Sequence, residues 1–126
     1  MNPREYPHLG TMICFHIRYD LGDYHPIRRL NYTNWQDMAG ALVKEFNAAV
    51  ILPLYLLDHS SISLSTHPFN NMWDSGQVGY ILVSKPDVAK WFGTKYCTKA
   101  LIKKATAILM NEVDDYNVYL ENGDDE

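Results

Sequence analysis

The segment from Trp73 to Ser84, WDSGQVGYILVS, constrains the fold of this chain more than any other. It opens with Asp, Ser and Gly, which favour a turn because Asp and Ser bond nearby backbone groups and Gly tolerates positive φ. The run 77–83 is rich in apolar and β-branched residues on both faces, which predicts a central strand covered on both sides. Gly79 interrupts this run and marks either a bulge or a close approach to the backbone.

A helix is expected directly after this strand. Ser84 is a candidate N-cap, Pro86 suits the first turn, and Asp87 places an acid where a helix N-terminus favours one. Gly93 is the expected end of this short helix. A longer helix of about 24 residues begins near Thr98, because apolar residues then recur every three or four positions. Its predicted buried stripe is Ile102, Ala105, Leu109, Val113, Tyr116 and Leu120.

The N-terminal part predicts one strand, a loop and one helix after an irregular segment 1–10. The run Thr11–Tyr19 alternates as a strand does, and its expected core face is Ile13, Phe15, Ile17 and Tyr19. Residues 20–31 carry Gly, Pro and two Arg and predict a loop that exposes Tyr24. Thr33 and Gln36 have the spacing of a capping box, so an amphipathic helix of about three turns is expected, ending at Asn47.

The middle of the chain predicts a hairpin. Residues 48–57 are continuously apolar except for Pro53, which indicates an edge strand or a bulge. Residues 58–60 predict a tight turn, and 61–66 alternate as the returning strand. The complete order, strand–helix–strand–strand–strand–helix–helix, predicts a single α+β domain with a mostly antiparallel sheet of about four strands. We expect that domain to cover residues 1–121 and an acidic tail to cover 122–126.

Composition narrows the class of protein. The chain has 126 residues, 47% of them hydrophobic, which suits one domain with an ordinary core. No apolar run reaches the roughly 20 residues of a membrane span, and the N-terminus lacks the pattern of a signal peptide. Cys14 and Cys97 form no metal or redox motif and are expected to be reduced thiols, with burial favoured over chemistry. We therefore expect a cytoplasmic protein, without a membrane partner.

Charge is divided unevenly along the chain. Residues 1–111 hold eight of the fifteen acids and all eleven basic residues, a net charge of +3, whereas residues 112–126 carry −7. The acids of that C-terminal part are Glu112, Asp114, Asp115, Glu121, Asp124, Asp125 and Glu126. A helix dipole favours cations near the C-terminus, so these acids do not stabilise the long helix. Solvation of a frayed end is one interpretation, and an anionic surface for a basic partner is the other.

Few motifs indicate catalysis or metal binding. Asp58, His59, Asp74 and Ser75 contain the residue types of a hydrolase triad, but no G-x-S-x-G elbow accompanies them, and geometry rather than sequence proximity defines such a site. No catalytic residue is assigned. Candidate metal ligands are His16, Asp20, Asp23 and His25, or His59 with His67. Neither set has a zinc-site spacing, and no dinucleotide or Walker loop is present, so no metal or cofactor is expected.

Two kinds of partner remain open. Arg18, Arg28 and Arg29 lie among aromatic residues that stack on single-stranded nucleic acid in other proteins. Those aromatic residues are Tyr19, Tyr24, Tyr32 and Trp35. A pI near 5.7 and the acidic end disfavour direct nucleic-acid binding. A protein partner is favoured, because Tyr and Arg are enriched at interface hot spots, and its expected contacts include Tyr24, Arg28 and Arg29.

Four segments carry a resemblance to a known family. They are LGTMICFHIRYDLGD (9–23), PLYLLDHS (53–60), STHPF (65–69) and WDSGQVGYI (73–81). Together they resemble a family of small uncharacterised proteins of bacteriophages and other mobile elements, with a core of the form PLYLxDHS…WDSGQVGxI. The resemblance implies that members of this family extend beyond the position of residue 126. The resemblance implies a genomic setting in which small accessory proteins counter host defence.

That setting supplies a functional expectation and no catalytic residues. Anti-CRISPR and anti-restriction proteins commonly bind a nuclease or its nucleic-acid-handling surface. The resemblance therefore implies a counter-defence inhibitor in the host cytoplasm, with a defence nuclease or effector complex as its protein partner. The acidic end suits this expectation, because it is able to occupy a basic groove meant for DNA or RNA. A small hydrolase and a nucleic-acid-binding protein are the alternatives.

Overall fold

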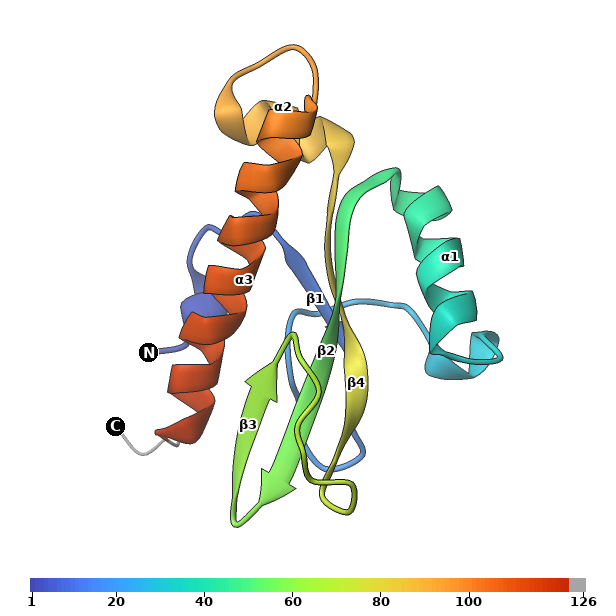
Figure 1. The fold of residues 1–126 in the computed structure, drawn as a ribbon, viewed down its shortest axis with the longest axis vertical. Helices are drawn as coiled ribbons and strands as arrows, with labels where there is room; N and C mark the ends of the chain where they lie inside the picture. The colour runs from blue at the N-terminus through green and yellow to red at the C-terminus, as the bar shows by residue number, and fades with distance from the viewer. Residues whose placement is uncertain (123–126) are drawn as a thin grey trace.

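The computed structural model describes residues 1–122 and has the predicted α+β architecture (Figure 1). The described strands are β1 (Thr11–Cys14), β2 (Ala48–His59), β3 (Ser61–Ser65) and β4 (Ser75–Ser84). The helices are α1 (Trp35–Phe46), α2 (Lys85–Phe92) and α3 (Lys99–Glu121), with short 3-10 helices η1 (Pro3–Glu5) and η2 (Arg29–Asn31). Their order along the chain is the predicted one.

Strand β4 is a central strand of the sheet, as predicted, and β2 is the other. The strand order is β1-β4-β2-β3 and every pair is antiparallel. Residues 78–83 are buried throughout, because β4 has a neighbour on each side and helices on both faces. A Cβ atom on Gly79 would lie 1.9 Å from the carbonyl oxygen of Ile13, so the close approach indicated by the sequence is confirmed.

Two apolar layers hold the sheet between the helices (Figure 1). Helix α1 inserts Met38 and Leu42 against one face of the sheet, over Tyr80 and Leu82. Helices α2 and α3 cover the opposite face. The fully buried residues that α2 and α3 contribute there are Val88, Ala105, Leu109 and Val113, all from the predicted helical positions.

Local signals set the helix boundaries. Ser84 caps α2 by accepting a hydrogen bond from the backbone N–H of Asp87, and Gly93 ends α2 with φ +68°. Thr98 caps α3 in the same way, and Asn47 ends α1 in the left-handed conformation. The predicted capping box on Thr33 is wrong by one residue, because Asn34 is the N-cap and accepts from the N–H of Asp37.

The first strand is shorter than predicted. It ends at Cys14, and the chain then turns because the Nδ1 atom of His16 accepts the backbone N–H groups of Arg18 and Tyr19. Ile17, which the alternation placed on the core face, is fully exposed at 102%. Both faces of the remaining strand are buried, since it lies beside the central strand.

Pro53 lies inside the continuous strand β2. Strand β3 pairs only with residues 55–59 of β2, so at Pro53 the strand has β4 as its neighbour and a free second side. A register shift follows between Leu54 and Tyr55. This half-edge position accommodates a residue that lacks an N–H. The strand continues to His59, which reduces the predicted turn to Ser60, with φ +62°.

Within residues 1–122, no helix combines the length and the apolar content that a membrane crossing requires.

Candidate functional site

The residues of the predicted hydrolase cluster meet at one end of the sheet. Asp58 and His59 end β2, while Asp74 and Ser75 lie where β4 begins, and antiparallel pairing brings the two strand ends together. The Nδ1 atom of His59 lies 2.8 Å from a carboxylate oxygen of Asp74. Asp58 instead pairs with the guanidinium of Arg18. The four residues are therefore not joined in one site: His59 pairs with Asp74, and Asp58 pairs with Arg18. Ser75 belongs to neither pair.

Ser75 lacks the contact that would activate it as a nucleophile. Its hydroxyl donates to the backbone carbonyl of Asn71, and not to His59. A serine nucleophile requires a base within hydrogen-bond reach of its hydroxyl, which this arrangement does not supply. Asp58, Asp74 and Ser75 do line a hollow of about 410 Å³, together with Arg18 and Trp73. The geometry thus provides a surface hollow with charged walls and no assembled Ser–His–Asp triad.

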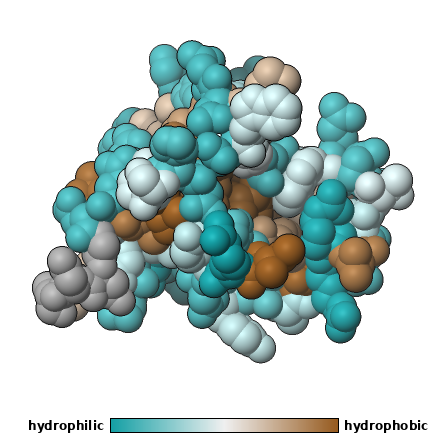
Figure 2. Space-filling model, turned by 90° about the horizontal axis from the view of Figure 1, so that it is seen from below, coloured by the Kyte–Doolittle hydropathy of each residue, from teal (hydrophilic) through white to brown (hydrophobic). Residues whose placement is uncertain are grey.

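A second hollow of about 680 Å³ adjoins the first, since Phe15 and His16 line both. Large apolar side chains stand exposed on the loops around these two hollows. They are Ile17, Tyr24, Leu30, Met72 and Trp73, each at least 90% exposed, and we call them the hairpin-end surface. Figure 2 views this end of the molecule and shows brown apolar side chains among hydrophilic ones. Turns and loops, which periodicity describes poorly, carry all members except Leu30, which lies in the short helix η2.

The candidate metal ligands that the sequence offered have other contacts. Among residues 1–122, no three His, Cys, Asp or Glu side chains are grouped to hold a metal ion. His16 accepts two backbone N–H groups, and the Nε2 atom of His25 lies 3.1 Å from the carbonyl oxygen of Cys14. Asp23 binds Arg4. Asp20 lines one surface hollow together with His16, Asp23 and His25, and the Nδ1 atom of His67 lies 3.1 Å from the hydroxyl of Thr66.

The three arginines of the predicted basic loop differ in their contacts. Arg18 pairs with Asp58, and Arg29 stacks over the ring of Trp35 with its guanidinium carbon 4.4 Å from the ring centroid. Arg28 is exposed, and Tyr24 beside this loop belongs to the hairpin-end surface. Of these three arginines, Arg18 alone is paired with an acid of residues 1–122, so Arg28 and Arg29 keep their positive charge where the sequence indicated a nucleic-acid site.

The acidic residues do not all lie on one surface. Asp114, Asp115 and Glu121 are exposed on α3, and Glu121 accepts a hydrogen bond of 2.7 Å from the hydroxyl of Ser63. The expectation that Glu112 belongs to the same anionic surface is wrong, because its side chain is only 13% exposed and points toward the N-terminal segment. Asp124 and Asp125 lie outside the described residues.

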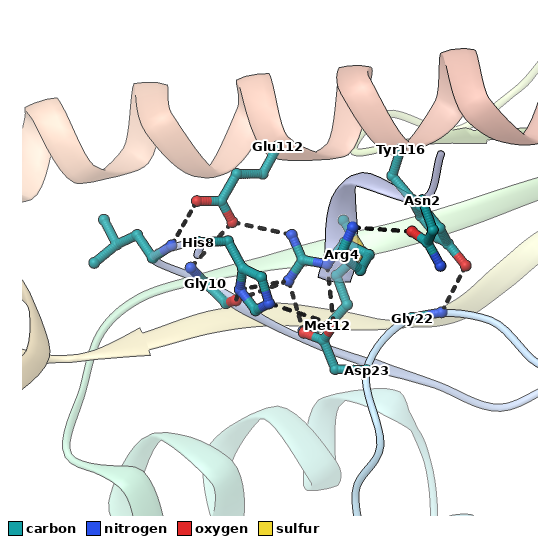
Figure 3. A network of polar contacts seen from close by, with 10 residues as sticks. Asn2, Arg4, His8, Gly10, Met12, Gly22, Asp23, Glu112 and Tyr116 are labelled. Atoms are coloured by element: carbon teal, nitrogen blue, oxygen red, sulfur yellow. Dashed lines mark hydrogen bonds and ion pairs between the residues drawn. The ribbon is translucent and has the colours of Figure 1, made fainter. Parts of the chain in front are cut away.

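Glu112 belongs to a polar network around Arg4 that the sequence did not reveal (Figure 3). The buried guanidinium of Arg4 lies 2.6 Å from Asp23 and 3.2 Å from Glu112. The Glu112 carboxylate also accepts the backbone N–H groups of Leu9 and Gly10. Burial alone would lower the pKa of Arg4, but the two carboxylates outweigh it, so the pKa is raised.

This network is structural rather than catalytic. Its charges are paired with one another, and it joins η1 and β1 to α3, which lies far from both in the sequence (Figure 3). Asp23 also accepts the N–H of Met12 on the outer side of β1. The partners of Arg4 lie 19 and 108 residues away, so no local spacing indicates them.

Burial also raises the pKa of the Cys14 thiol and of the Tyr116 phenol, which lie near this network. Burial raises the pKa of Cys14 to about 12, and the charge of Asp23 acts in the same direction. The pKa of Tyr116 is raised by burial, although its oxygen accepts the N–H of Gly22, which acts in the opposite direction. Neither group forms a nucleophile at neutral pH. The predicted state of both cysteines as free thiols is confirmed.

Comparison of the chain with known protein families, with curated proteins and with solved structures finds no match in any of the three.

Proposed function

We propose that this chain is a non-enzymatic binding protein that contacts a protein partner through its hairpin-end surface. The observation that carries the proposal is that four large, almost fully exposed apolar side chains of this surface line two adjoining hollows, with the exposed Met72 next to one of them in the chain. Single exposed apolar residues are ordinary on protein surfaces, whereas a contiguous group of them marks an interaction site.

The chemistry of this surface favours a protein. Trp73 and Tyr24 supply large, rigid contact area, and Arg18 lines the same hollow as Trp73 and adds a polar group. Trp, Tyr and Arg are the residues that most often dominate binding energy at protein interfaces. Charged residues around an apolar centre resemble the rim and core of such an interface.

A nucleic-acid-handling complex of a host defence system is the partner that we propose. The support is the resemblance to small phage and mobile-element proteins, together with the exposed acids Asp114, Asp115 and Glu121 on α3. Proteins that handle DNA or RNA present basic surfaces, which such acids complement. On this proposal the chain acts as a counter-defence inhibitor of the anti-CRISPR or anti-restriction type.

The test is capture of partners from host lysate after nuclease treatment, followed by binding of the purified partner. We compare the native chain with Trp73→Ala and with Ile17→Ser, using Tyr6→Ala as a control, because Tyr6 is also exposed but lines neither hollow. A defence nuclease or effector subunit should bind the native chain and the control, and bind each hairpin-end variant at least tenfold more weakly. Equal affinity of all four proteins would exclude the hairpin-end surface.

One observation favours a hydrolase as the second candidate. The contact between His59 and Asp74 resembles an oriented general base, and a hollow lined by Asp74 lies beside it. In this alternative a water molecule, rather than Ser75, is the nucleophile. Hydrolysis of an ester or phosphodiester substrate that disappears in both His59→Gln and Asp74→Asn would support it. Hydrolysis that persists in both variants would show that His59 and Asp74 do not catalyse it, and would exclude this alternative.

A further inference from the structure

Six of the seven lysines in the chain lie between residues 85 and 104, and the structure gathers them where α2, its connection to α3, and the start of α3 meet. We call this region the lysine corner. Its members are Lys85 and Lys90 of α2, Lys95 of the connection, and Lys99, Lys103 and Lys104 of α3. All six are exposed, and among residues 1–122 none forms an ion pair with an acid.

The lysine corner is strongly cationic in a chain whose net charge is −4. Asp87 is the single acid between residues 75 and 111, so this stretch has a net charge of +5. The acids of α3 do not neutralise it. Lys103 and Asp114 are 11 residues apart on one helix, about 16 Å along the axis, which is twice the screening length of about 8 Å at physiological salt.

Helix stability does not account for this charge. Thr98 caps α3, and the positive end of the helix dipole therefore points toward Lys99 and its neighbours. A helix N-terminus favours acids, so three lysines in the first two turns oppose the dipole and one another. Their placement is understandable when an anion outside the chain supplies the compensating charge.

Exposed aromatic residues lie among the lysines. Trp91 is 47% exposed in the last turn of α2, and Tyr96 is 69% exposed in the connection. The ammonium group of Lys95 lies 5.5 Å from the centroid of the Tyr96 ring. Cationic surfaces that also offer aromatic faces bind single-stranded nucleic acid, because the cations contact phosphates while unpaired bases stack on the rings.

A lipid surface fits these observations less well. Membrane-surface helices insert a broad apolar face between lipids. The apolar faces of α2 and α3 are occupied by the protein core, where Val88, Ala105 and Leu109 are fully buried. The exposed side chains of the lysine corner are therefore mainly ammonium groups, with two separate rings. A duplex also fits less well, because its paired and stacked bases offer no free face to those rings.

We propose that the lysine corner binds single-stranded nucleic acid through phosphate contacts from its lysines and base stacking on Trp91 and Tyr96. The site lies on elements other than those of the arginine loop that the sequence indicated, and at the end of the molecule opposite the hairpin-end surface (Figure 1). The exposed acids of α3, which are Asp114, Asp115 and Glu121, lie in the half of the helix away from the lysine corner. The acids are then directed away from the bound strand.

The experiment is a titration of the purified chain into a fluorescently labelled 15-nucleotide thymidine strand, followed by anisotropy at several salt concentrations. Lys95, Lys103 and Lys104 are replaced by Gln in one triple variant, and Trp91→Ala is a second variant. We expect the triple variant to bind at least tenfold more weakly and to lose about two units of the slope of log K against log salt, at about 0.7 for each single-strand contact. Trp91→Ala should weaken binding and leave the slope unchanged.

Matched controls keep this test independent of the proposed protein-binding function. Lys44→Gln removes an exposed lysine from α1, and Trp73→Ala removes an aromatic residue from the hairpin-end surface. Both should bind the strand as the native chain does, and circular dichroism verifies that each variant is folded. The proposal is overturned by absence of binding at 50 mM salt, by native affinity of the triple variant, by equal affinity for a duplex, or by binding to phosphatidylserine vesicles without binding to the strand.

Discussion

The guanidinium of Arg4 meets the carboxylate of Asp23 at 2.6 Å, and this contact fixes the first turn of the chain against the outer side of β1. Asp23 closes that side by accepting the N–H of Met12 and by donating its own N–H to the Met12 carbonyl. The pair therefore connects the N-terminal segment to a sheet edge, and Glu112 connects both to α3.

Replacing Arg4 with Met should destabilise the fold by about 3–5 kcal/mol. The substitution fills a similar space but leaves Asp23 and Glu112 in a largely buried position without their cation, and one-sided removal of a buried pair has this cost. Urea unfolding measures the change. Arg28→Met is the control, and as an exposed substitution it should change stability by less than about 0.5 kcal/mol. Similar losses in the two variants would contradict the assigned role of the network.

Two glycine substitutions should have opposite signs. Gly79→Ala places a methyl group 1.9 Å from the Ile13 carbonyl oxygen, so β1 has to separate from β4, and we expect a loss of about 3 kcal/mol or more. Gly40→Ala meets no atom within 4 Å and lies inside α1, so it should stabilise the protein by about 0.5–1 kcal/mol. Thermal unfolding of both variants checks the pair, and a stable Gly79→Ala would disprove the close packing of the two strands.

Asn117 protects the outer edge of β3. Its side-chain oxygen accepts the N–H of Leu64 at 2.7 Å, a group that would otherwise point from the sheet without a strand partner. Asn117→Leu should cost about 1–3 kcal/mol, because the N–H loses its acceptor, and should increase self-association through the freed edge. Light scattering and urea unfolding measure the two effects. Asn111→Leu, an exposed change on the same helix, should produce neither.

Stability should fall in alkali because of Cys14. Its folded pKa is about 12 against an ordinary 9.0, so the folded state keeps the thiol proton where the unfolded chain has lost it. The stabilising contribution is complete below pH 9 and decreases as the pH rises toward 12. Tyr116, whose pKa is also raised, acts in the same direction. Urea midpoints at pH 8, 9 and 10.5 should fall less steeply in Cys14→Ala than in Cys97→Ala, and equal slopes would refute the assignment.

Short-range signals predicted most of the elements. Ser84, Gly93 and Thr98 act on backbone groups within a few residues, so their sequence context is also their structural context. The apolar stripe of α3 and the doubly covered strand β4 were predictable for the same reason, because periodicity reports which faces are buried.

The errors arose where a local pattern had two interpretations. The alternation in residues 11–19 fits a strand, but the ring of His16 competes for backbone N–H groups and turns the chain away after Cys14. Ile17 then belongs to a surface rather than to the core. Glu112 carries the same charge as the acids around it in the sequence. Its position on the helix, however, directs it toward Arg4, a residue 108 positions away.

The candidate sites show the same limit. Pairing of β2 with β4 unites His59 and Asp74, which the sequence placed together only as a hypothesis. The exposed residues of the hairpin-end surface are spread over two loops, and the lysine corner depends on the packing of α2 beside α3. Neither the hairpin-end surface nor the lysine corner can be recognised from the order of residues alone.

The pairing of β1 has a consequence for how the chain folds during synthesis. Its only strand partner in the described chain is β4, with Ile13 opposite Tyr80, and the Arg4 network is completed only by Glu112. Strand β1 therefore pairs only after β4 has been synthesised, and the Arg4 network is complete only after Glu112 has been. Contacts of such wide sequence separation form slowly. In a nascent chain halted before Glu112, we expect the N-terminal segment to remain unanchored and the edge of β4 that pairs with β1 to remain unpaired.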